Sequence, residues 1–511
     1  MKHIGKIFIS TASVILVASC SLDTIPSDRY TVETFWQSAE GTEAAMTGCY
    51  NVLMHSGALN IDPLLEDSAT PNEYNYSNSH GWNEIALGTH SANSAGVISD
   101  RWKACYEGIG RCNTHLDRLP GAVASEERKL QMEGEAKFLR ALYYYLLVTY
   151  YNGVPLVLSI PEMSHGTLPR SSREEVVSQI IGDLDRAAEC LDWKWGSKSD
   201  KGRATKGAAM SLKARLLLFE ASPLVNEKGD LALWKKAVDA AAEVMDHAKD
   251  AGYDLFPDYR KLFLPANEHS CECIFDVEYS KTKNTPINAW NVQSVQYRNN
   301  APLLDLVNAY ESSDGKTYAQ DNYDKKDPRF KATVFYPGCT FLGKANSTAT
   351  QICQFTGFAH KKLTIYDNQA RDPDDGNGET NYMFIRYADV LLMFAEAKNE
   401  VETSPSAEVY SALNAVRKRA GIPIIKTGTL DKEQMREVIR HERRIEFAGE
   451  GLYYNDIRRW KIAEEVMNDE ICDYNGTAIA IRSFDPERDY WWPIPSEQRL
   501  LNKNLDQNPN Y

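Results

Sequence analysis

Two stretches of the chain mix aromatic rings with amide side chains in a pattern that could hold a flat, hydroxyl-rich ligand. The first, residues 70–84 (TPNEYNYSNSHGWNE), places Tyr74, Tyr76 and Trp82 among several asparagines, one of which is Asn83. A sugar ring has an apolar C–H face, so an aromatic side chain can cover that face while neighbouring amides bond the hydroxyl groups. We therefore predict that these four residues bind a ligand of this kind.

The second stretch, residues 284–300 (NTPINAWNVQSVQYRNN), has the same character. It carries Trp290 and Tyr297 beside Asn291 and Arg298, and we predict that these four residues also contact the ligand. Neither stretch repeats apolar residues at helical spacing, which favours loops. The alternative is that each ring packs its loop onto the rest of the protein, and Arg298 could equally form a structural ion pair.

A different chemistry is predicted at Cys20, within SVILVASCSLDTIP (residues 13–26). Two lysines precede an apolar or small-residue run, Ile7 to Ser19, which is too short to span a bilayer but typical of a secretory signal. Ala-Ser-Cys at its end resembles the lipobox of bacterial lipoproteins. We expect residues 1–19 to be a signal peptide and Cys20 to carry acyl chains, such as palmitate, that anchor the protein. The alternative is an ordinary signal peptide with an incidental cysteine.

Motifs for catalysis and metal binding are missing from the sequence. There is no G-x-S-x-G, P-loop or G-x-G-x-x-G, and HERRIEF (residues 441–447) lacks the second histidine of H-E-x-x-H. The stretch DPDDGNGE (372–379) resembles a calcium loop, but its twelfth position is Met383 rather than glutamate, so we predict a solvated turn. Nine further cysteines are scattered, and we expect buried thiols rather than a zinc site. We predict no catalytic residue, no metal and no cofactor.

The composition limits the class of protein. The chain has 511 residues, 43% of them hydrophobic, and a formal net charge of −14. These values predict a folded protein, and the negative charge argues against nucleic acid as a partner because phosphate binding needs a cationic surface. No stretch after the signal is apolar enough to cross a membrane as a helix.

The elements that must position the two aromatic stretches are mostly helices. Apolar residues at i, i+3 and i+4 spacing, together with capping residues such as Ser125 and either Ser171 or Ser172, predict helical blocks over about 100–250 and 383–468. Helix-pair lengths are close to those of tetratricopeptide repeats, although the signature residues are absent. From about 253 to 382, proline, glycine and asparagine become frequent, and CIFDVEYS and KATVFYP predict short strands. The fold class is therefore mainly α, with a loop-rich region that contains small β elements.

Seven segments in order resemble the SusD/RagB family of outer-membrane lipoproteins of Bacteroidetes. They are AKFLRALYYYLLVTYYNGVPLV (136–157), LPRSSREEVVSQIIGDLDRA (168–187), ATKGAAMSLKARLLLFEASPLVN (204–226), DPRFKATVFYPG (327–338), FIRYADVLLMFAEAKNE (384–400), IRHERRIEFAGEGLYYNDIRRWKIAEEV (439–466) and WWPIPSEQRLLNKNLDQNPNY (491–511). Together they span nearly all of residues 20–511, which we treat as one SusD-like domain.

The resemblance implies a fold and a function. The fold is four tetratricopeptide-like helix pairs with a loop-rich remainder packed on them. The function is that of a surface lipoprotein without a catalytic centre, which captures a nutrient, usually an oligosaccharide, and delivers it to a TonB-dependent (SusC-like) transporter. Alternatives are capture of a peptide or other nutrient, and a mainly structural role as the lid of the transporter. The loops match no fixed family motif, so the resemblance assigns no ligand-binding residue by position.

Overall fold

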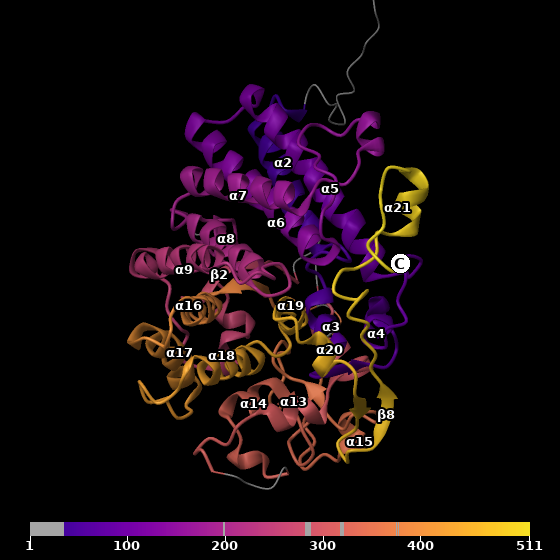
Figure 1. Cartoon of the computed structure of the whole chain (residues 1–511), viewed down its shortest axis with the longest axis vertical. Coiled ribbons are helices and arrows are strands. Elements are labelled where there is room, and N and C mark those ends of the chain that lie inside the picture. Colours follow the sequence, from indigo (N-terminus) through magenta and orange to yellow (C-terminus); the bar gives the residue numbers. More distant parts are fainter. Residues whose placement is uncertain (1–34, 198–199, 282–287, 317–320, 375, 377) are drawn as a thin grey trace, which may run out of the picture.

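The structure is a computed structural model of the chain (Figure 1). It describes residues 35–511, except 198–199, 282–287, 317–320, 375 and 377. The predicted signal peptide (1–19) and Cys20 lie outside the described residues. Within the described part of the chain, no helix is both long and apolar enough to cross a membrane.

The first helical block begins the described chain. Its main helices are α2 (Ala39–Asn51), α5 (Val97–Arg118), α6 (Glu126–Tyr151), α7 (Arg173–Cys190), α8 (Lys206–Ala221) and α9 (Leu231–Asp246). From α5 to α9 each helix packs against the next in the sequence, as expected for consecutive antiparallel pairs (Figure 1).

Side-chain caps fix where these helices start. The hydroxyl of Ser125 accepts a hydrogen bond from the backbone of Arg128 at the start of α6. Ser172 and Glu175 form a reciprocal capping box at the start of α7. Both caps were predicted from the sequence and are confirmed.

The second helical block comprises α16 (Tyr387–Val401), α17 (Ala407–Ala420), α18 (Lys432–Glu446), α19 (Tyr453–Arg459) and α20 (Ala463–Val466). Helix α16 packs against α9 and α8 of the first block as well as against α17 and α18. The two blocks therefore share one continuous hydrophobic core, although a long loop-rich segment separates them in the sequence. The prediction of a mainly α fold with small β elements is confirmed.

Short elements fill the loop-rich region and the chain ends. The short helices are α3 (Asp62–Glu66), α4 (Trp82–Ala86), α10 (Ala248–Ala251), α11 (Tyr259–Leu262), α12 (Trp290–Val292), α13 (Leu304–Ala309), α14 (Pro328–Thr333), α15 (Ala349–Ile352) and α21 (Ser496–Leu501). The strands are β1 (Glu73–Asn75), β2 (Cys273–Val277), β3 (Asn300–Pro302), β4 (Val334–Phe335), β5 (Ala359–His360), β6 (Tyr382–Arg386), β7 (Glu470–Cys472) and β8 (Ala478–Ile481). They pair antiparallel as β1–β3, β2–β6, β4–β5 and β7–β8.

One predicted helix start is wrong. The pattern from residue 384 onward indicated a helix, but residues 382–386 form β6 and pair with β2, and α16 begins at Tyr387. Four of the five β6 residues are buried. An apolar run buried on both faces does not distinguish a strand from a helix by its periodicity.

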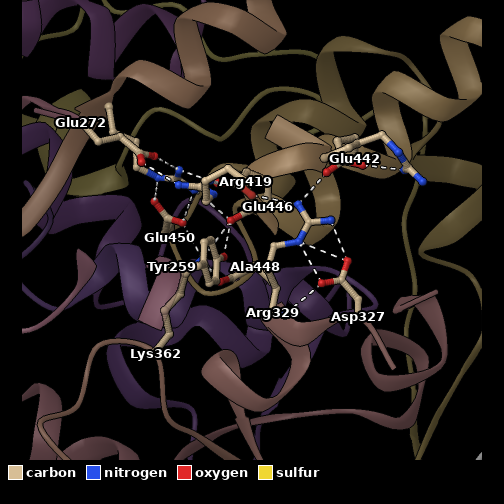
Figure 2. Close-up of polar contacts among 12 residues, drawn as sticks. Tyr259, Glu272, Asp327, Arg329, Lys362, Arg419, Glu442, Glu446, Ala448 and Glu450 are labelled. Carbon is tan, nitrogen blue, oxygen red and sulfur yellow. Dashed lines mark hydrogen bonds and ion pairs between the residues drawn. The ribbon is translucent and has the colours of Figure 1, made fainter. Parts of the chain in front are cut away.

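A buried network of ion pairs connects α18 to the loop-rich region (Figure 2). Glu446, at the end of α18, accepts hydrogen bonds from Arg329, Arg386 and Arg419, and all four side chains are no more than 3% exposed. Attraction by the surrounding cations outweighs burial and lowers the pKa of Glu446. Glu442, one turn earlier on α18, is also buried and pairs with Arg329 and Arg417.

This network also holds the turn after α18. The ammonium of Lys362 donates to the carbonyls of Glu446 and Ala448, at 3.0 and 2.9 Å, and to the carboxylate of Glu450 at 2.5 Å (Figure 2). The next backbone amide in the turn, that of Gly449, donates to Asp67 at 2.8 Å. The turn therefore links the ion network to the segment that leads into β1.

Candidate functional site

The structure brings the two predicted aromatic stretches together. Strand β1 from the first stretch pairs with β3, which continues the second, in the register Glu73↔Pro302, Tyr74↔Ala301 and Asn75↔Asn300. Glu73 and Asn75 are buried and Tyr74 is half-buried. Side chains alternate along a strand, so Tyr74 and Tyr76 leave the chain on the opposite side from the buried pair.

An aromatic cluster forms where these stretches meet a third segment, and we define it as Tyr76, Tyr297 and Phe355. The rings of Tyr76 and Phe355 stack with centroids 3.8 Å apart and an interplanar angle of 26°. The hydroxyl of Tyr76 donates to the backbone carbonyl of Tyr297 at 2.5 Å. The Tyr297 side chain is 52% exposed, so the cluster presents a ring to solvent.

Local backbone structure sets the position of Tyr297. A short π-helix, η8 (Gln293–Tyr297), follows α12, and Arg298 ends it in the left-handed conformation at φ 53°. The guanidinium of Arg298 donates to the backbone carbonyls of Gln351 and Ile352 at 3.1 and 2.9 Å. Arg298 thus ties the Tyr297 segment to the segment that carries Phe355, which is a positioning role.

Polar residues flank Tyr297 and Phe355 in the sequence. Gln296 and Gln354 are exposed, and Asn299 is half-buried and donates to Gln293 at 2.9 Å. The guanidinium of Arg371 donates to the side-chain oxygen of Gln296. An exposed ring with amides and a guanidinium beside it can stack on an apolar ligand face and bond hydroxyl groups at its edge.

Trp82 lies in the core, which corrects the expectation that its ring faces a ligand. The side chain is 0% exposed, and its ring packs edge-on against Trp492 and Tyr454, with centroids 5.6 and 6.1 Å away. The indole N–H donates to Asp62 at 3.0 Å. Burial opposes ionisation of Asp62, but hydrogen bonding to His80 and nearby positive charge outweigh it and lower the pKa of this carboxyl.

Trp290 and Asn291 are also placed inside the molecule. Trp290 is 1% exposed, and its ring stacks on Tyr382 of β6 at 5.7 Å. The side-chain oxygen of Asn291 accepts a hydrogen bond from the backbone of Ile365 at 3.0 Å. With no exposed ring face, Trp290 serves here to pack α12 onto the core. Asn83 is half-buried, and its ligand role and that of Tyr74 stay predictions.

Phe355 completes the cluster, although it is not among the residues predicted from the sequence. It lies in QICQFTGF, a stretch without tryptophan, tyrosine or asparagine, and it follows Tyr76 by more than half of the chain. Only the tertiary structure places it against Tyr76.

Buried polar residues hold the β1–β3 pair on its inner side. The side chain of Asn300 donates to Glu73 and to the backbone carbonyl of Leu64, the latter at 2.7 Å. His360 lies 3.0 Å from Glu73. Asp67 is fully buried nearby, and burial, together with the charge of Glu73, raises its pKa well above the usual range. These contacts fix the β1–β3 pair from below and leave the aromatic cluster on the outer side.

Two cavities lie elsewhere, at the end of the molecule formed by α5 and α6. The larger, of about 680 Å³, is lined by charged residues that include Lys129, Glu133, Lys137 and Arg140, and no aromatic ring is among its lining residues. The smaller, of about 330 Å³, is mainly apolar. Its lining includes Trp102, Tyr106, Pro155, Pro161, Leu501 and Leu505.

Comparison with known proteins decides the family. A family model described as "SusD family" matches residues 271–511, and another, described as "Starch-binding associating with outer membrane", matches residues 27–218. The chain belongs to the SusD/RagB family. This confirms the resemblance seen in the seven sequence segments.

Relatives in the SusD/RagB family match along most of their length. The SusD-like protein P25 of Formosa agariphila is 27% identical over 89% of this chain and 90% of its own. A SusD-like carbohydrate-binding protein of Bacteroides fragilis has a solved structure that covers 93% of this chain and 100% of its own, with a TM-score of 0.81 and 25% identity. Another SusD-like protein from that species gives a TM-score of 0.78 at 26% identity, covering 94% of this chain and 99% of its own.

Proposed function

We propose that this protein is a cell-surface lipoprotein that captures an oligosaccharide and passes it, unaltered, to a TonB-dependent transporter of the outer membrane. The observation that carries the proposal is the aromatic cluster, which lies where three loop segments meet and has the exposed residues Gln296 and Gln354 beside it. Two features of the comparisons support it: a matched family described as starch-binding and associated with the outer membrane, and a similar structure described as carbohydrate-binding.

Binding at the cluster would combine stacking with hydroxyl hydrogen bonds. The ring of Tyr297 would stack on the ligand. Tyr76, which stacks on Phe355, holds the backbone of Tyr297 through its hydroxyl. Gln296 and Gln354 would form hydrogen bonds with the edge of the ligand. The site lies on an open surface rather than in either cavity, so it covers only part of a ligand. We therefore expect modest affinity, because the buried area must first offset the entropy lost on association.

The size of the stacking contribution follows from the exposure of Tyr297. A tyrosine side chain can bury about 200 Å², so 52% exposure leaves roughly 100 Å² of its surface open. If a sugar covers half of that area, about 50 Å² at roughly 25 cal/mol per Å² gives ~1.3 kcal/mol. This corresponds to about a tenfold change in Kd.

The test is calorimetry of the purified protein with a panel of polysaccharides and oligosaccharides. We expect Tyr297→Ala to weaken binding about tenfold, while Ile424→Ala, which removes another exposed side chain (62%) between α17 and α18, leaves it unchanged. Unchanged affinity in Tyr297→Ala would reject the aromatic cluster as the site. Binding of peptides but of no glycan would favour the peptide alternative, and product release from any polysaccharide would reject the non-catalytic role.

The lipid anchor at Cys20 is part of the proposal. We expect Cys20→Ala to leave the fold intact and to move the protein from the outer-membrane fraction to the soluble fraction in cells that lack the transporter. Retention of the variant in the membrane fraction of those cells would reject the anchor. Protease shaving of intact cells would then report whether the anchored protein faces the cell exterior.

An apolar face supports the partnership with a transporter. We define it by its exposed side chains, Val123, Leu130, Leu158, Met163, Leu500 and Leu501, which are 42–97% exposed. Part of it borders the smaller cavity. The backbone amide of Val123 donates to the carbonyl of Trp36, so the described chain begins beside Val123. Large exposed apolar side chains such as these favour contact with another protein.

The partner role has its own test. We expect Leu500→Asp with Leu501→Asp to reduce co-purification with the transporter, and Ile424→Asp to leave it unchanged. If the transporter is retained equally by both, the apolar face is not the contact surface. If the protein acts mainly as a structural part of the transporter, its deletion should abolish nutrient uptake, whereas the Tyr297→Ala variant should take up nutrient as the wild type does.

A further inference from the structure

A group of metal-ligating side chains lies away from the aromatic cluster, at the end of β2. Asp276 and Glu278 are two residues apart on an extended segment, so both side chains point to the same side. His269, in the loop before β2, reaches back to both carboxylates. Its Nδ1 atom lies 3.6 Å from an Asp276 oxygen and its Nε2 atom lies 3.0 Å from a Glu278 oxygen.

These distances suit a shared metal ion. One ligand atom from each of the three residues can be chosen so that all lie within 4.8 Å of one another. Zinc bonds of about 2.0–2.2 Å in tetrahedral geometry place neighbouring ligand atoms roughly 3.3–3.6 Å apart. The two carboxylates contact different nitrogens of the imidazole, and an ion binds only one of these nitrogens. One carboxylate must therefore rotate toward the nitrogen that the other faces before all three groups can hold one ion.

Acidic side chains outnumber basic ones in this group, so a bound cation would reduce its negative charge. Among the described residues, the ion-pair partner of Asp276 and of Glu278 is His269, and neither carboxylate pairs with a lysine or arginine. Glu268 adds a third carboxylate, held by the backbone amide of Asn381 at 2.9 Å. Three carboxylates against one imidazole is an arrangement that divalent ions neutralise well.

Neighbouring groups already orient the ligands. The amide of Asn381 donates to Asp276 at 2.9 Å. A Cβ atom at Gly202 would lie only 2.0 Å from a Glu278 oxygen, so the glycine leaves the room that this carboxylate occupies. Such supporting contacts around the ligands are typical of metal sites.

We propose that His269, Asp276 and Glu278 bind a divalent transition-metal ion of the zinc type. A histidine nitrogen with two carboxylates favours zinc over calcium, which prefers oxygen ligands. The ion joins the loop before β2 to the residue that follows β2.

The test is a titration of the purified, tag-free mature protein with Zn²⁺ in competition with a chromogenic zinc chelator. We expect one saturable site, and at least a tenfold loss of affinity in His269→Gln and in Asp276→Asn. His55→Gln is the matched control, because His55 lies 3.2 Å from Glu107 in a simple surface pair without a second carboxylate. It should bind zinc as the wild type does.

Thermal unfolding supplies a second readout that does not depend on the chelator. Zinc should raise the unfolding midpoint of the wild type and of His55→Gln, but not that of His269→Gln. No saturable zinc binding by the wild type, or a saturable site that survives His269→Gln and Asp276→Asn unchanged, would overturn the proposal. Circular dichroism of each variant without zinc checks that the fold is retained.

Discussion

Lys362 gives the sharpest test of how the buried ion network works. Its side chain is 0% exposed and donates to Glu450 and to the carbonyls of Glu446 and Ala448. Burial lowers the pKa of Lys362 to about 8, and the nearby charge of Arg386 acts in the same direction, only partly offset by Glu450. We consider the substitution Lys362→Met, which keeps an apolar stem of similar shape and removes the titrating group.

The magnitude and sign follow from linkage. In the unfolded chain a lysine titrates near 10.4, so between about pH 8 and 10.4 the unfolded state holds a proton that the folded state has released. The free energy of unfolding therefore rises with pH across this window because of Lys362, and the gain is lost as the pH falls through 8. A difference of about 2.5 pKa units at 1.36 kcal/mol each sets the full gain at roughly 3 kcal/mol.

The assay is urea unfolding of wild type and variant at several values between pH 7 and 10. Tyrosines and thiols of the unfolded chain also titrate in this range, but both proteins share them, so their effect cancels in the difference. We expect the stability of the wild type relative to Lys362→Met to increase by about 2–3 kcal/mol from pH 7.5 to 10. Lys361→Met is the control, since Lys361 is more exposed and pairs with Asp367, and its profile should run parallel to the wild type. A parallel profile for Lys362→Met as well would refute the reasoning.

Three further predictions concern single side chains. Trp82→Phe should lower the free energy of unfolding by about 1–2 kcal/mol, because the indole hydrogen bond is lost, and should leave the Kd for glycan unchanged. A roughly fivefold higher Kd would show that Trp82 contributes to ligand binding after all. Tyr76→Phe keeps the ring but loses the bond to the carbonyl of Tyr297, so glycan binding should weaken about threefold to tenfold by calorimetry, and an unchanged Kd would contradict a positioning role. Ser172→Ala removes a capping box and should cost about 1 kcal/mol in urea unfolding, whereas no loss would mean that tertiary contacts alone set the start of α7.

The helical scaffold could be predicted because its signals are local. Capping residues and apolar stripes lie within one helix, so Ser125 and Ser172 marked real helix starts. The boundary at Tyr387 was missed because β6 owes its structure to pairing with β2, more than a hundred residues earlier. The local sequence pattern of residues 382–386 fits a helix or a strand, and pairing with β2 makes them a strand.

The candidate site was only partly predictable for the same reason. The sequence singled out two stretches that the structure places side by side, but it did not show which rings face solvent. Trp82 and Trp290 are buried because Trp492 and Tyr382, distant in the sequence, cover them. Phe355 could be found only from the structure, since its partner Tyr76 belongs to another stretch.

The pairing of β1 with β3 has a consequence for the order in which the protein folds. The hydrogen bond from Tyr76 to Tyr297 spans 221 residues, and the loop it closes contains most of the first helical block and part of the loop-rich region. Closing so long a loop is entropically costly, so local helices form before such distant contacts. The aromatic surface is therefore a late product of folding, and an export intermediate with its helices already formed would have no binding activity until these strands meet.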